Sequence, residues 1–170
     1  MSTLSRCRAS LAAAGLMAVS LGGAAAGAMC AADEETLFSC PSAGKRIVVC
    51  ASKGWSPQSG YVQYRFGTRS HAELAVPGTS ATPPAQAIAV GQGPLSGGGF
   101  AYVRFANGSY EYFVYSAISG RWGTKSGVAV EKDGVRVTVR RCDAAHPGEF
   151  GAGLIERAGL PQADSHFELP

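Results

Sequence analysis

Carboxylates are the side chains of this sequence that could carry hydrolytic chemistry, because glycoside hydrolysis needs two of them facing one cleft. The strand-rich part of the chain offers four: Glu73, Glu111, Glu131 and Asp133. Asp133 is explained by its place in an Asp-Gly turn, and Glu111 by its place on one face of a predicted hairpin. A glycan-active enzyme is therefore kept only as a third functional hypothesis.

The histidine and glycine patterns give no better support for catalysis. His71, His146 and His166 fall in loop-like or tail-like sequence, away from the nucleophile that a Ser–His–Asp set requires. They have no zinc-ligand spacing to a cysteine, and the sequence contains no Cys-x-x-Cys pair. The glycine-rich string before Phe100 lacks the Gly-Lys-Ser/Thr ending of a phosphate-binding loop. The sequence thus predicts a non-enzymatic protein without a metal or cofactor.

That string, Ser96-Gly97-Gly98-Gly99, is nevertheless the most unusual local feature of the chain. Three glycines ahead of a strand indicate a bulge or a tight bend. The absence of side chains would also let another backbone approach closely, as in a binding loop. Both interpretations stay open, and all four residues are candidate binding residues.

Basic residues outnumber acidic ones in the middle of the chain. Between Thr36 and Cys142 there are 12 basic and four acidic residues, a balance of +8. Such an excess either covers ordinary solvated strand faces or attracts an anionic partner, such as a lipid headgroup or an acidic glycan. Lys125, Arg136 and Arg140 are the candidate binding residues of this kind.

The first 32 residues predict an export signal. Arg6 and Arg8 precede an uncharged, apolar run over residues 11–28, and acidic residues begin at Asp33. This order is typical of a secretory signal peptide. We expect a periplasmic or secreted protein with no transmembrane span once the signal is removed. Export argues against a nucleic-acid partner, although aromatic and basic residues interleave on several strands.

The cleavage point is left open by the sequence. Small residues allow cleavage after Ala28 or after Ala32. A lipid anchor at Cys30 is a further alternative, which the bulky Met29 disfavours.

The cysteines predict a disulfide-stapled domain, because thiols oxidise outside the cytoplasm. Cys40 and Cys142 bracket the strand-rich block, so a Cys40–Cys142 bond is the first choice. Cys50–Cys142 is the alternative, since spacing alone does not fix connectivity. Closing a loop of about 100 residues contributes about 4–5 kcal/mol if the unfolded chain loses the corresponding entropy. Cys30 joins this set only if cleavage follows Ala28.

Short alternating segments between turn residues predict an all-β domain, a small antiparallel sandwich or open barrel of about seven to nine strands. It covers residues 33–142, after the signal (1–32) and before an acidic tail (143–170) that contains proline and glycine. The tail is expected to hold one short helix, at 153–159, or to be disordered. Residues 77–94 are expected as a mobile loop with room for one short strand. The other strands are expected within 37–40, 46–51, 61–66, 72–76, 99–106, 109–116, 128–132 and 135–141.

Two hairpins are the clearest local signals. Asn107-Gly108 is a dipeptide favoured where both central turn residues need positive φ. Its arms are apolar on both faces, which predicts a central place in the sheet. The second hairpin turns at Asp133-Gly134. Its alternation predicts that three valines face inward and the intervening polar residues face outward: Val135, Val137 and Val139 against Arg136, Thr138 and Arg140.

The order of these segments resembles a group of small exported bacterial proteins without an assigned activity. The resemblance spans most of the mature domain and is carried by Phe38 to Cys40, Ile47 to Cys50, Tyr64 to Gly67, Gly97 to Gly99, Phe105 to Tyr112, Val130 to Gly134 and Cys142. A second likeness is to periplasmic inhibitors of c-type lysozyme, which are small cysteine-stapled β-barrels. It rests on the Ser96-to-Gly99 loop followed by Asn107-Gly108, and it implies that Ser96 and Lys125 would enter the lysozyme cleft.

Three hypotheses follow in order. The first is an exported, non-enzymatic β-domain that binds a protein or an anionic component of the envelope or the exterior. The second is a lysozyme inhibitor, against which the basic middle of the chain argues, because c-type lysozymes are also basic and like charges slow encounter. The third is the glycan-active enzyme.

Overall fold

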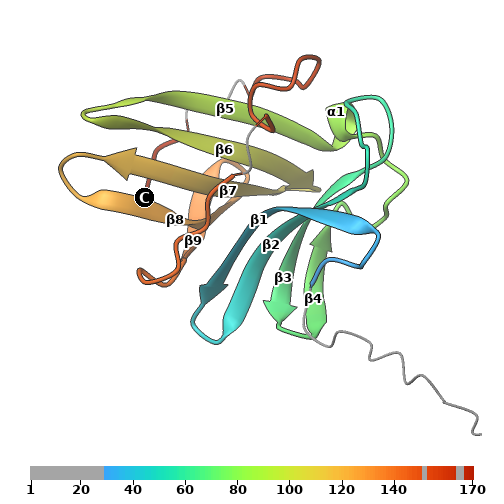
Figure 1. Cartoon of the computed structure of the whole chain (residues 1–170), viewed down its shortest axis with the longest axis horizontal. Coiled ribbons are helices and arrows are strands. Elements are labelled where there is room, and N and C mark those ends of the chain that lie inside the picture. Colours follow the sequence, from blue (N-terminus) through green and yellow to red (C-terminus); the bar gives the residue numbers. More distant parts are fainter. Residues whose placement is uncertain (1–28, 151–152, 164–166) are drawn as a thin grey trace, which may run out of the picture.

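The computed structural model describes residues 29–150, 153–163 and 167–170, which form two antiparallel sheets packed against each other (Figure 1). The first sheet has the order β1-β2-β3-β4, and the second has the order β5-β6-β7-β8-β9. The prediction of an all-β antiparallel fold is confirmed. The strands are β1 (Glu34–Ser42), β2 (Lys45–Ser52), β3 (Val62–Thr68), β4 (His71–Val76), β5 (Ile88–Leu95), β6 (Gly98–Asn107), β7 (Tyr110–Ser119), β8 (Gly123–Lys132) and β9 (Val135–Arg141). A short helix, α1 (Pro84–Ala87), precedes β5, and no helix within the described ranges has the length and apolar character needed to cross a bilayer.

The apolar core lies between the two sheets, because alternate side chains of each strand point to the same face. Tyr64 of β3 meets Phe105 of β6 there, with ring centroids 6.0 Å apart. The central strands β6 and β7 are apolar on their outer face as well, where Phe113 and Tyr115 pack on Phe167 of the tail. The predicted central position of this hairpin is confirmed.

The hairpin turns follow the chemistry of their residues. Ala43-Gly44 and Asp133-Gly134 have positive φ at both positions (47° and 77°, and 49° and 77°), as a type I′ turn requires. The turn between β6 and β7 differs from the predicted Asn107-Gly108 turn, because Asn107 pairs with Tyr110 and still belongs to β6. The loop is therefore Gly108-Ser109, with positive φ only at Gly108 (59°), which suits a type II′ turn.

Residues 77–94 contain more regular structure than the expected mobile loop. After α1, β5 pairs along its whole length with β6, from Ile88 opposite Phe105 to Leu95 opposite Gly98. The buried side chains of Ile88 and Val90 anchor the strand in the core. The pattern of the sequence is weak here because prolines, glycines and small residues surround these two anchors, and only pairing with β6 makes the segment a strand.

Strand β9 contradicts its predicted alternation. Val135 and Val137 are 66% and 53% exposed, and of the three valines only Val139 packs against a core cluster. The register between β8 and β9 shifts between Val130 and Glu131. Such a bulge changes which side chains share a face, and an edge strand tolerates exposed valines that a central strand would bury.

The described residues of the tail pack against the sheets. Leu154, Ile155 and Leu160 are buried in the core, and turns replace the helix expected at 153–159. So short a segment gains little as an isolated helix. The Val90 N–H donates to the Pro161 carbonyl (2.9 Å), and the Ala163 N–H donates to the Val90 carbonyl (2.8 Å). The tail thus covers part of the β5 edge, which would otherwise present unpaired backbone groups.

Two disulfides join distant parts of the described chain. Cys40–Cys142 links β1 to the end of β9 across a sequence separation of 102, and the first-choice pairing is confirmed. The alternative Cys50–Cys142 is wrong, because Cys50 bonds to Cys30, 20 residues away. The reason lies in strand alternation: Cys40 faces the core, whereas Cys50 points to the outer face of β2, where Cys30 lies.

Candidate functional site

The best-connected polar group lies where the N-terminal segment meets the first sheet. Arg65 donates to both carboxylate oxygens of Glu34 (2.6 and 2.7 Å), and the Tyr61 hydroxyl (2.6 Å) and the Ala31 N–H (2.5 Å) donate as well. The Glu34 side chain is only 2% exposed. Burial alone would raise the pKa of the Glu34 carboxyl, but the hydrogen bonds from Arg65 and Tyr61 outweigh it and hold the pKa below its ordinary value of 4.5. Glu34 is therefore a buried, ionised group.

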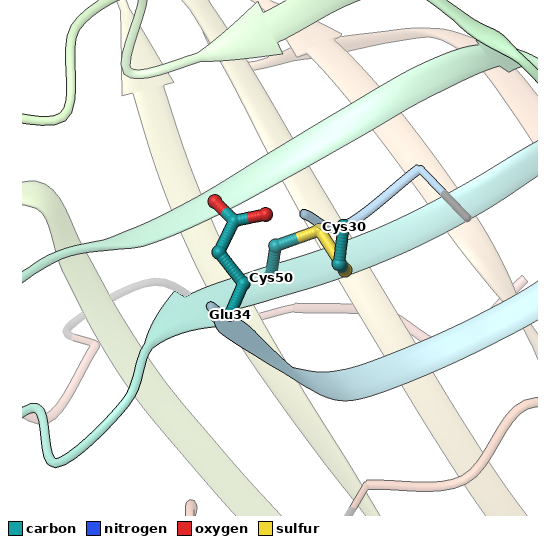
Figure 2. A group of neighbouring side chains, drawn as sticks. All are labelled: Cys30, Glu34 and Cys50. Atoms are coloured by element: carbon teal, nitrogen blue, oxygen red, sulfur yellow. A yellow bond between two sulfur atoms is a disulfide. The ribbon is translucent and has the colours of Figure 1, made fainter. Parts of the chain in front are cut away.

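Glu34 also lies beside the Cys30–Cys50 disulfide (Figure 2). The two sulfurs and a carboxylate oxygen lie within 4.8 Å of one another, and two thiolates with a carboxylate would be zinc-type ligands. Here the sulfurs bond to each other, and both carboxylate oxygens accept hydrogen bonds from Arg65. Arg65 also donates to the Met29 carbonyl (2.8 Å). The group therefore fastens the N-terminal segment to β2 and β3.

Three of the four candidate hydrolytic carboxylates form ion pairs with basic side chains, and the fourth, Asp133, lies in the β8–β9 turn. Glu111 and Glu131 lie directly opposite each other on β7 and β8. Arg104 Nη1 lies 2.8 Å from Glu111 Oε1, and Arg136 Nη2 lies 3.0 Å from Glu131 Oε1. Glu73 lies on β4 of the other sheet and also forms an ion pair. Glu111 and Glu131 share a face of the sheet, and each forms an ion pair with an arginine. This arrangement is typical of carboxylates that stabilise a sheet and not of a free acid and base.

The Ser96 loop and Lys125 lie at the same end of the second sheet, Ser96 in the β5–β6 turn and Lys125 on β8. The β5–β6 and β7–β8 turns lie side by side there, on the left in Figure 1. The Ser96 carbonyl accepts a hydrogen bond from the Gly120 N–H (3.1 Å). Lys125 Nζ lies 4.6 Å from the centre of the Trp122 ring, and Trp122 is 38% exposed. We call Ser96, Trp122 and Lys125, which are all exposed at this end of the sheet, the tip surface.

The glycines of the Ser96 loop allow it to pack closely against β7 and the β7–β8 turn. Gly97 has φ of 71°, which non-glycine residues rarely adopt, and a Cβ there would contact the backbone of Gly120. A Cβ on Gly98 would overlap the carbonyl oxygen of Ile118 in β7. The loop thus forms a tight bend pressed against the neighbouring strand. Its role in binding stays a prediction.

The two predicted arginines of β9 lie in different environments. Arg136 faces the outer side of the second sheet, where it pairs with Glu131 and lies 5.5 Å from the Phe167 ring. Arg140 instead lines a cleft of about 270 Å³ between the sheets and has no carboxylate partner within the described ranges.

We call the cleft lined by Arg140 the tyrosine cleft. Its residues come from five strands of both sheets, so sequence reasoning did not find it. The only sequence signal for this cleft was the alternation that puts Tyr110 and Tyr112 of β7 on one face. Its walls include Tyr64 and Phe66 of β3, Leu74 of β4, Tyr110 and Tyr112 of β7, and apolar side chains of β8 and β9.

Neither of the two described histidines lines this cleft. His71 begins β4 rather than lying in a loop, and His146 lies in the exposed segment after Cys142. His166 is outside the described residues.

Comparison with protein-family models, with curated proteins and with solved structures gives no match for this chain. The resemblances to small exported proteins and to lysozyme inhibitors therefore stay predictions.

Proposed function

We propose that this protein is an exported, non-enzymatic β-domain that binds an anionic partner of the envelope or the exterior. The observation that carries the proposal is an excess of unpaired cations: eight basic residues of the β-domain have no carboxylate partner within the described ranges. Five of them fall within residues 121–141, on β8, β9 and the turn before β8. Exposed cations without neighbouring carboxylates raise the local concentration of anions. The eight are Arg46, Lys53, Arg69, Arg121, Lys125, Lys132, Arg140 and Arg141.

The disulfides support a location outside the reducing cytoplasm, since such bonds persist in oxidising compartments. The Cys30 sulfur is bonded to Cys50, so it is not available for the thioether of a lipid anchor. The Met29 carbonyl and Cys30 both contact the first sheet. We therefore propose cleavage after Ala28 and release of the mature chain without a lipid.

The test measures binding of the full mature protein to vesicles of phosphatidylglycerol, with phosphatidylcholine vesicles as the neutral control. We expect binding to the anionic vesicles only, weakening as salt is raised from low to physiological concentration. Equal binding to both lipids, or binding insensitive to salt, contradicts the electrostatic mechanism.

Two variants with equal loss of charge locate the surface. Lys125→Gln with Arg141→Gln removes two exposed cations of β8 and β9. Lys53→Gln with Arg69→Gln removes two exposed cations from the loops that connect strands of the first sheet. Each cation near an anionic bilayer contributes about 1 kcal/mol, so the first variant should lose about tenfold or more in affinity. The Lys53/Arg69 variant should lose less than half as much binding free energy as the Lys125/Arg141 variant. Equal losses would mean that net charge, not this surface, directs binding.

Lysozyme inhibition is the second candidate, because the tip surface joins the two residues that the resemblance singles out. Ser96 lies in the β5–β6 turn, which contacts the β7–β8 turn, and Lys125 lies near the start of β8 beside the exposed Trp122. Aromatic side chains surrounded by polar groups are the usual anchors of protein interfaces.

This candidate is tested by lysozyme activity in the presence of excess protein. Inhibition should be weakened at least tenfold by Lys125→Ala and left unchanged by Lys53→Ala, which alters an exposed lysine in the loop between β2 and β3. Full lysozyme activity at a large excess of the unaltered protein would eliminate this function.

A further inference from the structure

The tyrosine cleft is an unusually apolar opening for a surface with so many cations. Leu74 and Phe66 on one side face Tyr112 on the other, and the cleft encloses about 270 Å³. At about 30 Å³ per water, this volume equals that of about nine water molecules. It therefore suits a ligand of about ten non-hydrogen atoms.

Apolar surface continues outside the mouth of this cleft. Tyr110 is 38% exposed and Val137 is 53% exposed, and both line the cleft. Tyr110, Lys132 and Val135 follow one another across β7, β8 and β9, and Val135 is also exposed. Exposed apolar groups gathered around an opening are typical of a ligand-binding groove.

The polar groups of the cleft favour an anion. Arg140 lines it and, within the described residues, has neither an ion pair nor a hydrogen-bond partner. Lys132 Nζ lies 5.6 Å from the centre of the Tyr110 ring at the same mouth. No carboxylate lines the cleft among the described residues. An apolar ligand with an anionic group would thus lie near the Arg140 guanidinium, with no carboxylate of the cleft to repel it.

The phenols of the cleft remain hydrogen-bond donors. Burial raises the pKa of Tyr64, with a smaller contribution from neighbouring Tyr112, and burial likewise raises the pKa of Tyr112. Neither hydroxyl has a hydrogen-bond partner within the described residues. Neutral phenols can donate to a carboxylate, whereas phenolates would repel it.

We propose that the tyrosine cleft binds a free monocarboxylic acid with a short apolar chain, the chain against the tyrosine and valine walls and the carboxylate against Arg140. A medium-chain fatty acid such as octanoate has the required ten non-hydrogen atoms. Neither Lys125 nor Arg141 lines the cleft. The inference therefore goes beyond the proposed function, with which it shares only the cations Arg140 and Lys132, and it is tested separately.

The test compares octanoate, octanol and octylamine by calorimetric titration of the mature protein, with amide NMR shifts to locate the site. Octanoate should bind in a saturable way and shift the signals of Leu74 and Val137. Octanol should bind about tenfold more weakly, and octylamine should bind most weakly of the three. Absence of saturable octanoate binding, or shifts confined to other residues, overturns the proposal.

Three variants separate the contributions. Arg140→Gln should weaken octanoate about tenfold and leave octanol unchanged, because it removes only the charge. Val137→Trp, at an exposed position of an edge strand, should fill the mouth and weaken both ligands. Lys125→Gln with Arg141→Gln should leave octanoate unchanged. Equal weakening of octanoate and octanol by Arg140→Gln would refute the carboxylate contact, and binding to anionic vesicles without octanoate binding would refute the cleft ligand while sparing the proposed function.

Discussion

Replacing Glu34 by glutamine tests how the N-terminal segment is held on the domain. The substitution keeps the shape of the side chain but removes its charge and turns one acceptor into an amide donor. That amide N–H₂ would face the guanidinium of Arg65, which donates to both carboxylate oxygens in the native protein. Arg65 would be left buried without its counter-charge.

The structure sets the size of this effect. The side chains of Glu34 and Arg65 are 2% and 16% exposed, so neither charge can be replaced by full hydration without opening the segment. Removing one partner of a buried ion pair destabilises a protein by about 3–5 kcal/mol. We take the lower end, about 3 kcal/mol, because Arg65 can keep its bonds to Gln63 and the Met29 carbonyl.

Urea unfolding of the mature, oxidised protein measures this loss. With a slope of about 2 kcal/mol per molar urea, the unfolding midpoint should fall by about 1.5 M. The matched control is Glu73→Gln, which removes the partner of Lys45 in an exposed ion pair and should cost less than about 1 kcal/mol. Equal shifts for the two variants would refute the argument that burial makes the Glu34 pair important.

The pH dependence gives an independent check on the same group. Because the pKa of Glu34 is lower in the folded protein than its ordinary value of 4.5, its stabilisation is complete above about pH 4.5 and is lost as pH falls through the folded-state pKa. The native protein should therefore lose stability more steeply than Glu34→Gln on acidification below pH 4.5. Parallel pH profiles would contradict this assignment.

Three further outcomes are expected. Cys30→Ser, which opens a loop with a sequence separation of 20, should lower the free energy of unfolding by about 3 kcal/mol, measured by urea titration. Gly98→Ala should lower the melting temperature by several degrees, because its Cβ would overlap the Ile118 carbonyl oxygen, whereas Gly78→Ala, with open space around it, should change it little. The mass of the exported protein should be that of an unmodified chain beginning at Met29; a chain beginning after residue 32, or one with a lipid attached, would contradict the proposed cleavage.

Local patterns were enough to predict most of the strands and one disulfide. Ile47 to Val49 and the Asp133-Gly134 turn were identified because β-branched residues and positive-φ dipeptides act within a few residues of themselves. The same reasoning failed at Val137, where a bulge in the pairing with β8 changed the exposed face. It failed also at Ile88, whose strand exists through its pairing with β6.

The candidate sites depended even more on distant contacts. The resemblance named Ser96 and Lys125, but only the packing of the β5–β6 turn against the β7–β8 turn brings both residues to the same end of the second sheet. Arg140 was singled out for its charge alone. Its place in an apolar cleft could not be foreseen, because Tyr64 and Tyr112 belong to different sheets.

What the sequence by itself determined is the all-β character of this protein and the position of its Asp133-Gly134 turn, and it favoured the Cys40–Cys142 bond over the alternative without fixing it. Those features arise from alternation, turn chemistry and the order of the cysteines along the chain. Tertiary structure alone decided the Cys30–Cys50 bond, the burial of Glu34 against Arg65 and the existence of the tyrosine cleft. Each of these depends on which faces of separate strands meet, and the free energy of that packing is shared among residues far apart in sequence.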